Sequence, residues 1–247
     1  MLTKQNKLLL VLGFIFLTNA LLAEFIGVKI FSLEASLGFK PFDWFLPSFN
    51  LTAGVVLWPV VFIMTDIINE YFGKKGVKFL SFMAVGAILF AFIAVNVAMV
   101  LTPADFWIGA YKNTGVDNMQ NAYSAVFGQG MWIIAGSVIA FLVGQLLDVV
   151  VFTQIKKKTG EKMLWFRATG STLVSQLVDS FVVLFIAFYF SGRMDFMTVI
   201  QIGVVNYIFK FTVAVVLTPL LYLIHNLIDS YLGKDLAADL KIKAHHP

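Results

Sequence analysis

Acidic, amide and basic side chains recur at helical spacing inside otherwise apolar stretches of this chain. Each pair is three or four residues apart, a spacing that places both side chains on one face of a helix. If such faces meet, their carboxylates, carboxamides and ammonium group can bind a polar ligand by hydrogen bonds and charge. We expect the ligand-binding set to be Asp66, Gln145, Asp148, Gln176, Asp179, Asn206 and Lys210.

Other polar residues near this set have less specific interpretations. A supporting shell is expected from Asn19, Asn69, Glu70, Ser175 and Tyr207. Asn69 and Glu70 equally suit the cytoplasmic membrane interface, Glu24 suits the outer interface, and Lys210 can form a structural ion pair with an aspartate.

The composition of the chain identifies the medium that surrounds these residues. Of the 247 residues, 60% are hydrophobic and 13% are charged, and the mean hydropathy is +0.87. Soluble domains average about 45–50% apolar and about 25% charged residues. The chain is therefore expected to be an all-α integral membrane protein.

The absence of cysteine excludes disulfides, thiol catalysis and iron–sulfur clusters, and without paired histidines we expect no metal site and no cofactor.

Six stretches are long and apolar enough to cross a hydrocarbon core about 30 Å thick. They are residues 8–31, 51–72, 77–101, 131–152, 168–190 and 196–223, which we expect to form one domain over 1–247.

Lysines and arginines gather before the first stretch and after the second, fourth and sixth. The positive-inside rule then predicts cytoplasmic N- and C-termini, and the net charge of +4 indicates topology rather than nucleic-acid binding. In the long connection 102–130, residues 105–108 and 123–127 are expected to form interfacial helices, with a re-entrant loop as the alternative.

A charged side chain at the bilayer centre costs about 2.5–3.5 kcal/mol, so the polar faces must meet one another or a wet cavity. Val143-Gly-Gln-Leu-Leu-Asp and Val174-Ser-Gln-Leu-Val-Asp repeat on consecutive, oppositely directed spans. We expect the two Gln-x-x-Asp pairs to form a clamp at the membrane midplane, where transporters hold their substrates. Such a clamp, with aromatic residues nearby, suits a flat polar heterocycle such as a guanine-like base.

The order and spacing of four segments resemble the queuosine precursor transporter family (VUT type). They are Thr65-Asp-Ile-Ile-Asn-Glu-Tyr-Phe-Gly, Gly144-Gln-Leu-Leu-Asp-Val-Val-Val-Phe, Arg167-Ala-Thr-Gly-Ser-Thr-Leu-Val-Ser-Gln-Leu-Val-Asp-Ser and Asn206-Tyr-Ile-Phe-Lys. The resemblance implies a multi-pass bacterial inner-membrane protein that imports 7-cyano-7-deazaguanine (preQ0), 7-aminomethyl-7-deazaguanine (preQ1) or queuine for tRNA modification. Relatives often carry an arginine where this chain has Trp132. If that arginine steers substrate or coupling ion, the resemblance implies that this chain does so differently or handles another queuosine precursor.

Other classes of function remain as alternatives. An S-component-like subunit that binds substrate and needs a separate ATPase module would also have six helices, and the chain has no P-loop of its own. An intramembrane aspartyl protease would also place two aspartates at the midplane, but its Gly-x-Gly-Asp motif is absent. We therefore expect a transporter rather than an enzyme, in contact with lipid and a small-molecule substrate, and a homodimer is a plausible assembly for so small a bundle.

Overall fold

Long helices dominate the computed structural model, which describes residues 2–38, 48–128, 131–159 and 163–245. The helices are α1 (Lys4–Ile26), α2 (Leu33–Leu37), η1 (Ala53–Val56), α3 (Trp58–Val100), α4 (Asp105–Ile108), η2 (Lys112–Thr114), α5 (Met119–Phe127), α6 (Met131–Thr159), α7 (Leu164–Leu184), the π-helical turn η3 (Phe185–Tyr189), α8 (Phe196–Val216), α9 (Thr218–Leu232) and α10 (Lys234–His245). Strands β1 (Ile30–Ser32) and β2 (Asn50–Thr52) form an antiparallel ribbon in which Phe31 pairs with Leu51.

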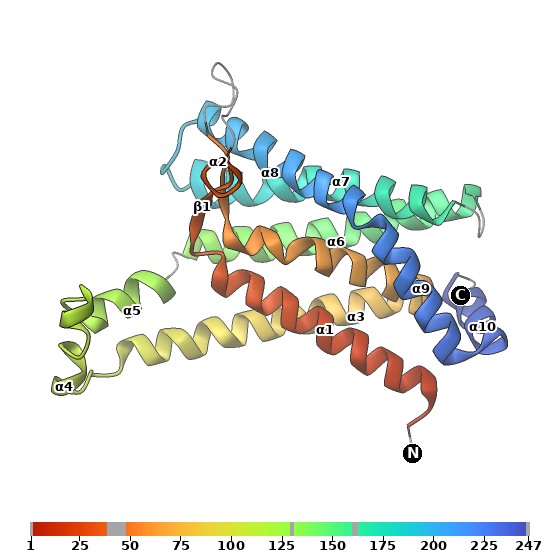
Figure 1. The fold of residues 1–247 in the computed structure, drawn as a ribbon, viewed down its shortest axis with the longest axis horizontal. Coiled ribbons are helices and arrows are strands. Elements are labelled where there is room, and N and C mark those ends of the chain that lie inside the picture. Colours follow the sequence, from red (N-terminus) through yellow and green to blue (C-terminus); the bar gives the residue numbers. More distant parts are fainter. Residues whose placement is uncertain (1, 39–47, 129–130, 160–162, 246–247) are drawn as a thin grey trace.

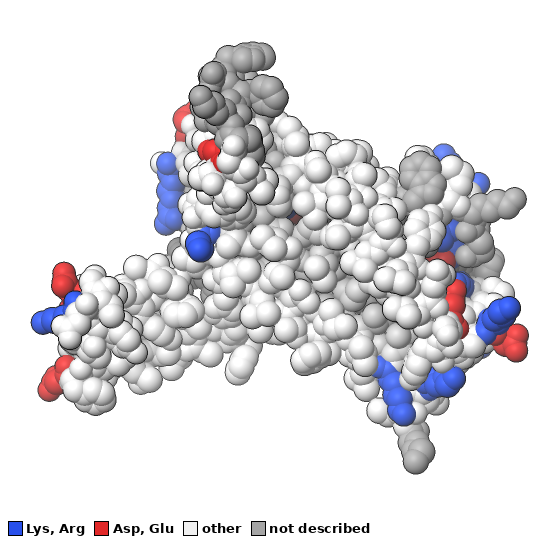
Figure 2. Space-filling view, viewed as in Figure 1, with Lys and Arg blue, Asp and Glu red and all other residues white. Residues whose placement is uncertain are grey.

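An apolar surface surrounds the middle of the helix bundle. Phe14, Phe90 and Val100 are 73%, 72% and 85% exposed, which is unfavourable in water but suits lipid tails. Figure 2 shows this white surface between two ends that carry the charged side chains. The arrangement supports the predicted all-α membrane protein, with a short β-ribbon that the sequence did not predict.

Among the described residues, five helical segments are long and apolar enough to span a membrane. Residues 53–100 form one of them, although 48 residues would make a straight helix about 72 Å long, more than twice the core thickness. The helix contains a break at Gly73, whose φ of 66° and ψ of −173° are not helical. Figure 1 shows α3 doubling back, so that both its ends lie away from the chain termini. Its two arms contain most of the predicted spans 51–72 and 77–101, although the first of these spans begins in β2 and η1.

The first and last predicted spans have different ends in the structure. Helix α1 stops at Ile26, where the Gly27 N–H bonds to the Ala23 carbonyl, and Ile30 and Phe31 belong to β1 instead. The predicted span 196–223 is divided at Leu217 into α8 and α9. Pro219 lies in the first turn of α9, where its missing N–H and its ring are compatible with a helix start but not with a continuous helix.

In the described part of the long connection 102–130, two short α-helices form, as predicted, with the 3-10 turn η2 between them. They are α4, which coincides with residues 105–108, and α5, which contains Tyr123. Both lie at the end of the molecule opposite the two termini (Figure 1). Between these ends α7 packs against α6 and α8, while α1 packs against α3. These contacts bring the polar faces of four long helices together.

Candidate functional site

A cavity of about 420 Å³ lies among α1, α3, α6, α7 and α8, near the helix ends that are distant from the termini. This volume falls in the range of small-molecule binding sites. Its polar lining includes Glu24, Ser137, Asp179, Ser180, Arg193, Asn206 and Lys210. Trp58, Val183 and Phe188 are among its apolar wall residues, so the cavity offers charge and hydrogen bonds against flat apolar surface.

An ion pair joins α7 to α8 in the wall of this cavity. The Lys210 ammonium donates to Asp179 at 2.5 Å, and both residues are more than nine-tenths buried. Glycines allow the helices to approach here: a Cβ on Gly144 would lie 3.3 Å from that of Asp179, and one on Gly203 would lie 2.5 Å from the Phe181 ring. The sequence allows two roles for Lys210, ligand binding and a structural ion pair. The structure shows the ion pair, with Asp179, and Lys210 also lines the cavity.

Glu24 corrects an expectation from the sequence. Instead of lying at the outer interface, it is 7% exposed, lines the cavity and accepts a hydrogen bond from the Ser137 hydroxyl of α6. Its burial follows from helix periodicity, because Phe16, Ala20 and Glu24 are four residues apart and all are buried. This spacing was the signal in the sequence that could have placed it inside the bundle.

A second polar layer lies one turn or more from the cavity, toward the end with the termini. Thr65 donates to the Gln145 carboxamide oxygen at 2.6 Å, and Ser175 donates to Asp148 at 3.1 Å. The Asp66 carboxyl lies beside that of Asp148, so α3, α6 and α7 meet in this layer. Asp66 lines a small void of about 20 Å³ that also touches α8 and α9.

The expected ligand-binding set is therefore divided between two levels. Asp179, Asn206 and Lys210 line the 420 Å³ cavity, whereas Gln145, Asp148 and Gln176 are buried away from its described lining. The predicted clamp of two Gln-x-x-Asp pairs thus contributes only Asp179 to the cavity in this conformation.

The expected supporting residues also have different surroundings. Asn19 donates a side-chain hydrogen bond to the carbonyl four residues earlier in its own helix, as does Asn206 of the ligand-binding set. Tyr207 stacks on Phe211, with ring centroids 6.3 Å apart, and Asn69 is fully buried. The side chain of Trp132 lies outside the part of the chain that the structure describes.

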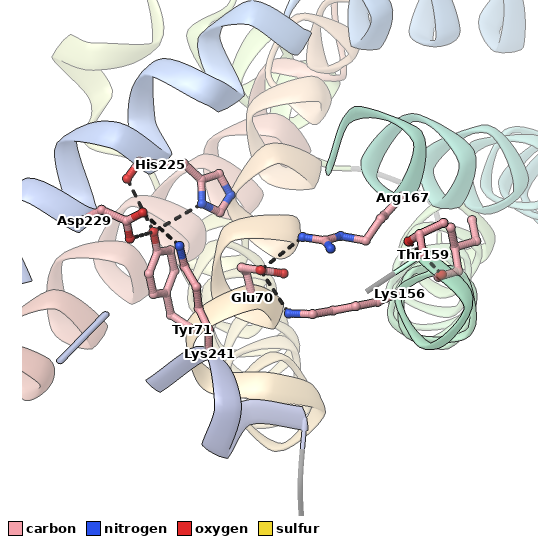
Figure 3. A network of polar contacts seen from close by, with 9 residues as sticks. Glu70, Tyr71, Lys156, Thr159, Arg167, His225, Asp229 and Lys241 are labelled. Carbon is pink, nitrogen blue, oxygen red and sulfur yellow. Dashed lines mark hydrogen bonds and ion pairs between the residues drawn. The ribbon is translucent and has the colours of Figure 1, made fainter. Parts of the chain in front are cut away.

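Glu70 belongs to a buried ion cluster at the end that carries the termini (Figure 3). Lys156 donates to it at 2.9 Å and Arg167 at 3.1 Å, and Glu70 is 2% exposed. The Arg167 guanidinium also lies 5.4 Å from the centre of the Phe152 ring. Glu70 is thus not a solvated interface residue, and its cluster fastens α3, α6 and α7 together.

A neighbouring network connects the turn of α3 to the C-terminal helices. The Tyr71 hydroxyl donates to Asp229 at 2.7 Å and lies 3.2 Å from Nδ1 of His225, and Lys241 pairs with Asp229 at 2.8 Å (Figure 3). Burial, together with the positive charge of Lys241, lowers the pKa of His225 to about 4. His225 is therefore neutral at physiological pH and packs its ring against Tyr71.

Comparison with known proteins identifies similar chains. Residues 52–224 match a family model described as "Putative vitamin uptake transporter". The "Probable queuosine precursor transporter" of Bacillus subtilis (strain 168) is 30% identical over 177 residues, which are 70% of this chain and 72% of that protein. The protein of the same name from Haemophilus influenzae is 29% identical, over 69% of this chain and 66% of that one. The "Queuosine precursor transporter" of Escherichia coli (strain K12) is 27% identical, over 68% of this chain and 69% of that one. No solved structure matches.

Proposed function

The chain belongs to the queuosine precursor transporter family, and on this premise we propose that it imports a 7-deazaguanine precursor of queuosine across a bacterial inner membrane. The observation that carries the proposal is the 420 Å³ cavity between helices, with Asp179, Lys210 and Asn206 in its wall. The candidates for the cargo are preQ0, preQ1 and queuine.

The chemistry of the cavity suits a 7-deazaguanine. Such a base presents two adjacent N–H donors and a carbonyl acceptor on one edge, which match a carboxylate and an ammonium or amide group. Its flat face can lie on an aromatic ring such as Trp58, an interaction worth about 1–3 kcal/mol per base. In this assignment Lys210 and Asn206 bind the carbonyl edge.

The two polar levels correspond to two stages of passage in our proposal. In this proposal α3 contributes two of six membrane spans, an even number that puts both termini on the same side, and the positive-inside rule assigns that side to the cytoplasm. The 420 Å³ cavity lies toward the opposite end and would then receive substrate from outside. The layer of Asp66, Gln145, Asp148 and Gln176 then contacts the base on its way inward. The Glu70–Lys156–Arg167 cluster closes the cytoplasmic end and must separate before release, as alternating access requires.

The test is uptake of radiolabelled preQ0 and preQ1 by cells that cannot synthesise them. We expect Asp179→Asn to lower uptake by at least tenfold at equal membrane abundance. Asp117→Asn is the matched control, because Asp117 is exposed and distant from the cavity lining. Equal uptake by Asp179→Asn and Asp117→Asn would exclude the assigned site, and absence of uptake by the unmodified chain would exclude the function.

Reconstitution distinguishes this proposal from a subunit that depends on an ATPase. Proteoliposomes that contain only this chain should accumulate or equilibrate labelled preQ0 without ATP. Uptake that needs ATP and a co-purified ATPase would instead establish the S-component-like alternative.

A further inference from the structure

The carboxyl group of Glu24 is a candidate for direct contact with a ligand. It projects from α1 into the 420 Å³ cavity, and the Ser137 hydroxyl of α6 donates a hydrogen bond to it. Both residues line the cavity, so this contact fixes the carboxyl group from the opposite helix. A buried acid that is fixed in a cavity wall is positioned to accept donors from a bound molecule.

Asp179 is less suited to receive the donor edge of a base. Its carboxylate already accepts the charge-assisted hydrogen bond of Lys210 at 2.5 Å, which joins α7 to α8. Charge-assisted bonds are about twice as strong as neutral ones, so a ligand would have to compete with the ammonium for Asp179. The Ser137 hydroxyl that donates to Glu24 is, in contrast, a neutral donor.

The surroundings of Glu24 leave room for a flat molecule. The lining of the same cavity contains small residues, namely Ala23, Gly27, Gly54 and Ala140, and the aromatic residue Trp58. A Cβ on Gly54 would lie 2.4 Å from the Ala23 carbonyl oxygen, so the close approach of α1 to η1 requires glycine. The cavity lining thus combines an acceptor group with a planar apolar side chain.

We propose that Glu24, oriented by Ser137, accepts the two adjacent N–H donors of a guanine-type edge and thereby selects bases that carry a 2-amino group. The inference rests on the proposed function and revises its specificity, because it assigns the donor edge to α1 rather than to the repeated Gln-x-x-Asp pairs. Asp179 and Lys210 then bind the remaining polar groups of the base as a fixed pair.

The experiment compares two unlabelled competitors for uptake of labelled preQ0. One is 7-deazaguanine, and the other is 7-deazahypoxanthine, which lacks the 2-amino group. In the unmodified protein we expect 7-deazaguanine to compete at a concentration about 10- to 100-fold lower, the effect of one charge-assisted hydrogen bond. Glu24→Gln should reduce this ratio to below about threefold, because the amide loses one acceptor oxygen and the charge.

Two variants separate selection by Glu24 from general damage. Asp179→Asn should lower uptake but keep the competition ratio, and Ser137→Ala should lower the ratio partly, because the carboxylate remains but loses its orientation. The same ratio is measured by ligand-induced thermal shift on purified variants, so a variant with poor uptake still reports on selection. A Glu24→Gln protein that keeps the full ratio in both assays would overturn the inference while uptake by the unmodified chain upheld the function. Absence of preQ0 uptake and binding by the unmodified chain would instead overturn both.

Discussion

Replacement of Lys210 by methionine tests whether the Asp179–Lys210 pair holds α7 and α8 together. The change keeps the aliphatic stem and removes the ammonium, so Asp179 retains its burial but loses the donor at 2.5 Å. Removal of one partner of a buried ion pair costs about 3–5 kcal/mol, because the other charge remains in a low-dielectric medium. Asp179 borders the 420 Å³ cavity, and water there can solvate it, so we expect about 3 kcal/mol.

The assay is a double-mutant cycle on thermal unfolding in detergent. A destabilisation of 1 kcal/mol shifts the melting temperature of a domain of 150–250 residues by about 2–4 °C, so Lys210→Met should lower it by about 6–12 °C. Asp179→Asn leaves the ammonium unpaired and should have a similar effect. The double variant removes both charges and should recover at least half of the summed loss.

Additive losses would refute this reasoning. If the double variant melts as low as the sum of the two single variants predicts, the pair contributes no coupling energy and the two residues act independently. A single Lys210→Met variant that melts like the unmodified protein would show that Asp179 is already solvated, and the contact between α7 and α8 would then depend on apolar packing at Gly203 and Phe181.

Three further predictions concern the end of the molecule that carries the termini. Glu70→Gln removes the acid between Lys156 and Arg167, so the cluster should no longer hold this end of the bundle closed. A single Ser171→Cys variant of this naturally cysteine-free chain should then be labelled faster by a maleimide. Unchanged labelling would contradict the role of the cluster. Because His225 has a pKa of about 4 when folded and about 6.5 when unfolded, the unfolded chain binds more protons between these values. Stability should thus fall by about 2 kcal/mol from pH 7.5 to pH 5, and His225→Gln should remove that slope in thermal melts. Gly73→Ala should destabilise the fold by about 2 kcal/mol or more in the same melts, because Gly73 has a φ of 66° and an added Cβ would lie 2.2 Å from the Ala244 carbonyl oxygen. The control Gly86→Ala should be neutral or stabilising.

Helical spacing predicted correctly which polar residues leave the lipid. Gln145, Asp148, Gln176 and Asp179 are all at most 5% exposed, since a polar group facing lipid is costly enough to decide the orientation of a helix. The same reasoning does not give the level at which each residue meets its partners. That level depends on how α6, α7 and α8 are staggered, and glycines such as Gly144 and Gly203 influence this through close packing.

Basic residues were harder to interpret because the sequence assigns them two roles. Lys156 and Arg167 count as markers of the cytoplasmic side, yet they are 7% and 1% exposed and pair with Glu70. A count of positive charges cannot separate a solvated lysine from one that reaches back into the bundle, since both lie near a span end. The three-residue strands β1 and β2 were also missed, because so short a segment has no measurable alternation.

The separation between the cavity and the Glu70 cluster has an energetic consequence for transport. In the proposed cycle, opening the end that carries the termini must break two contacts of Glu70, at 2.9 and 3.1 Å, and a conformer that costs about 3 kcal/mol is populated at under about 1%. Water entering from that end would solvate the released charges and lower this cost. Substrate would have to provide the rest through contacts that exist only once the 420 Å³ cavity closes around it. Glu24 on α1 and Asp179 on α7 face one cavity from different helices, so a base bound to both would draw these helices together as the inner end opens.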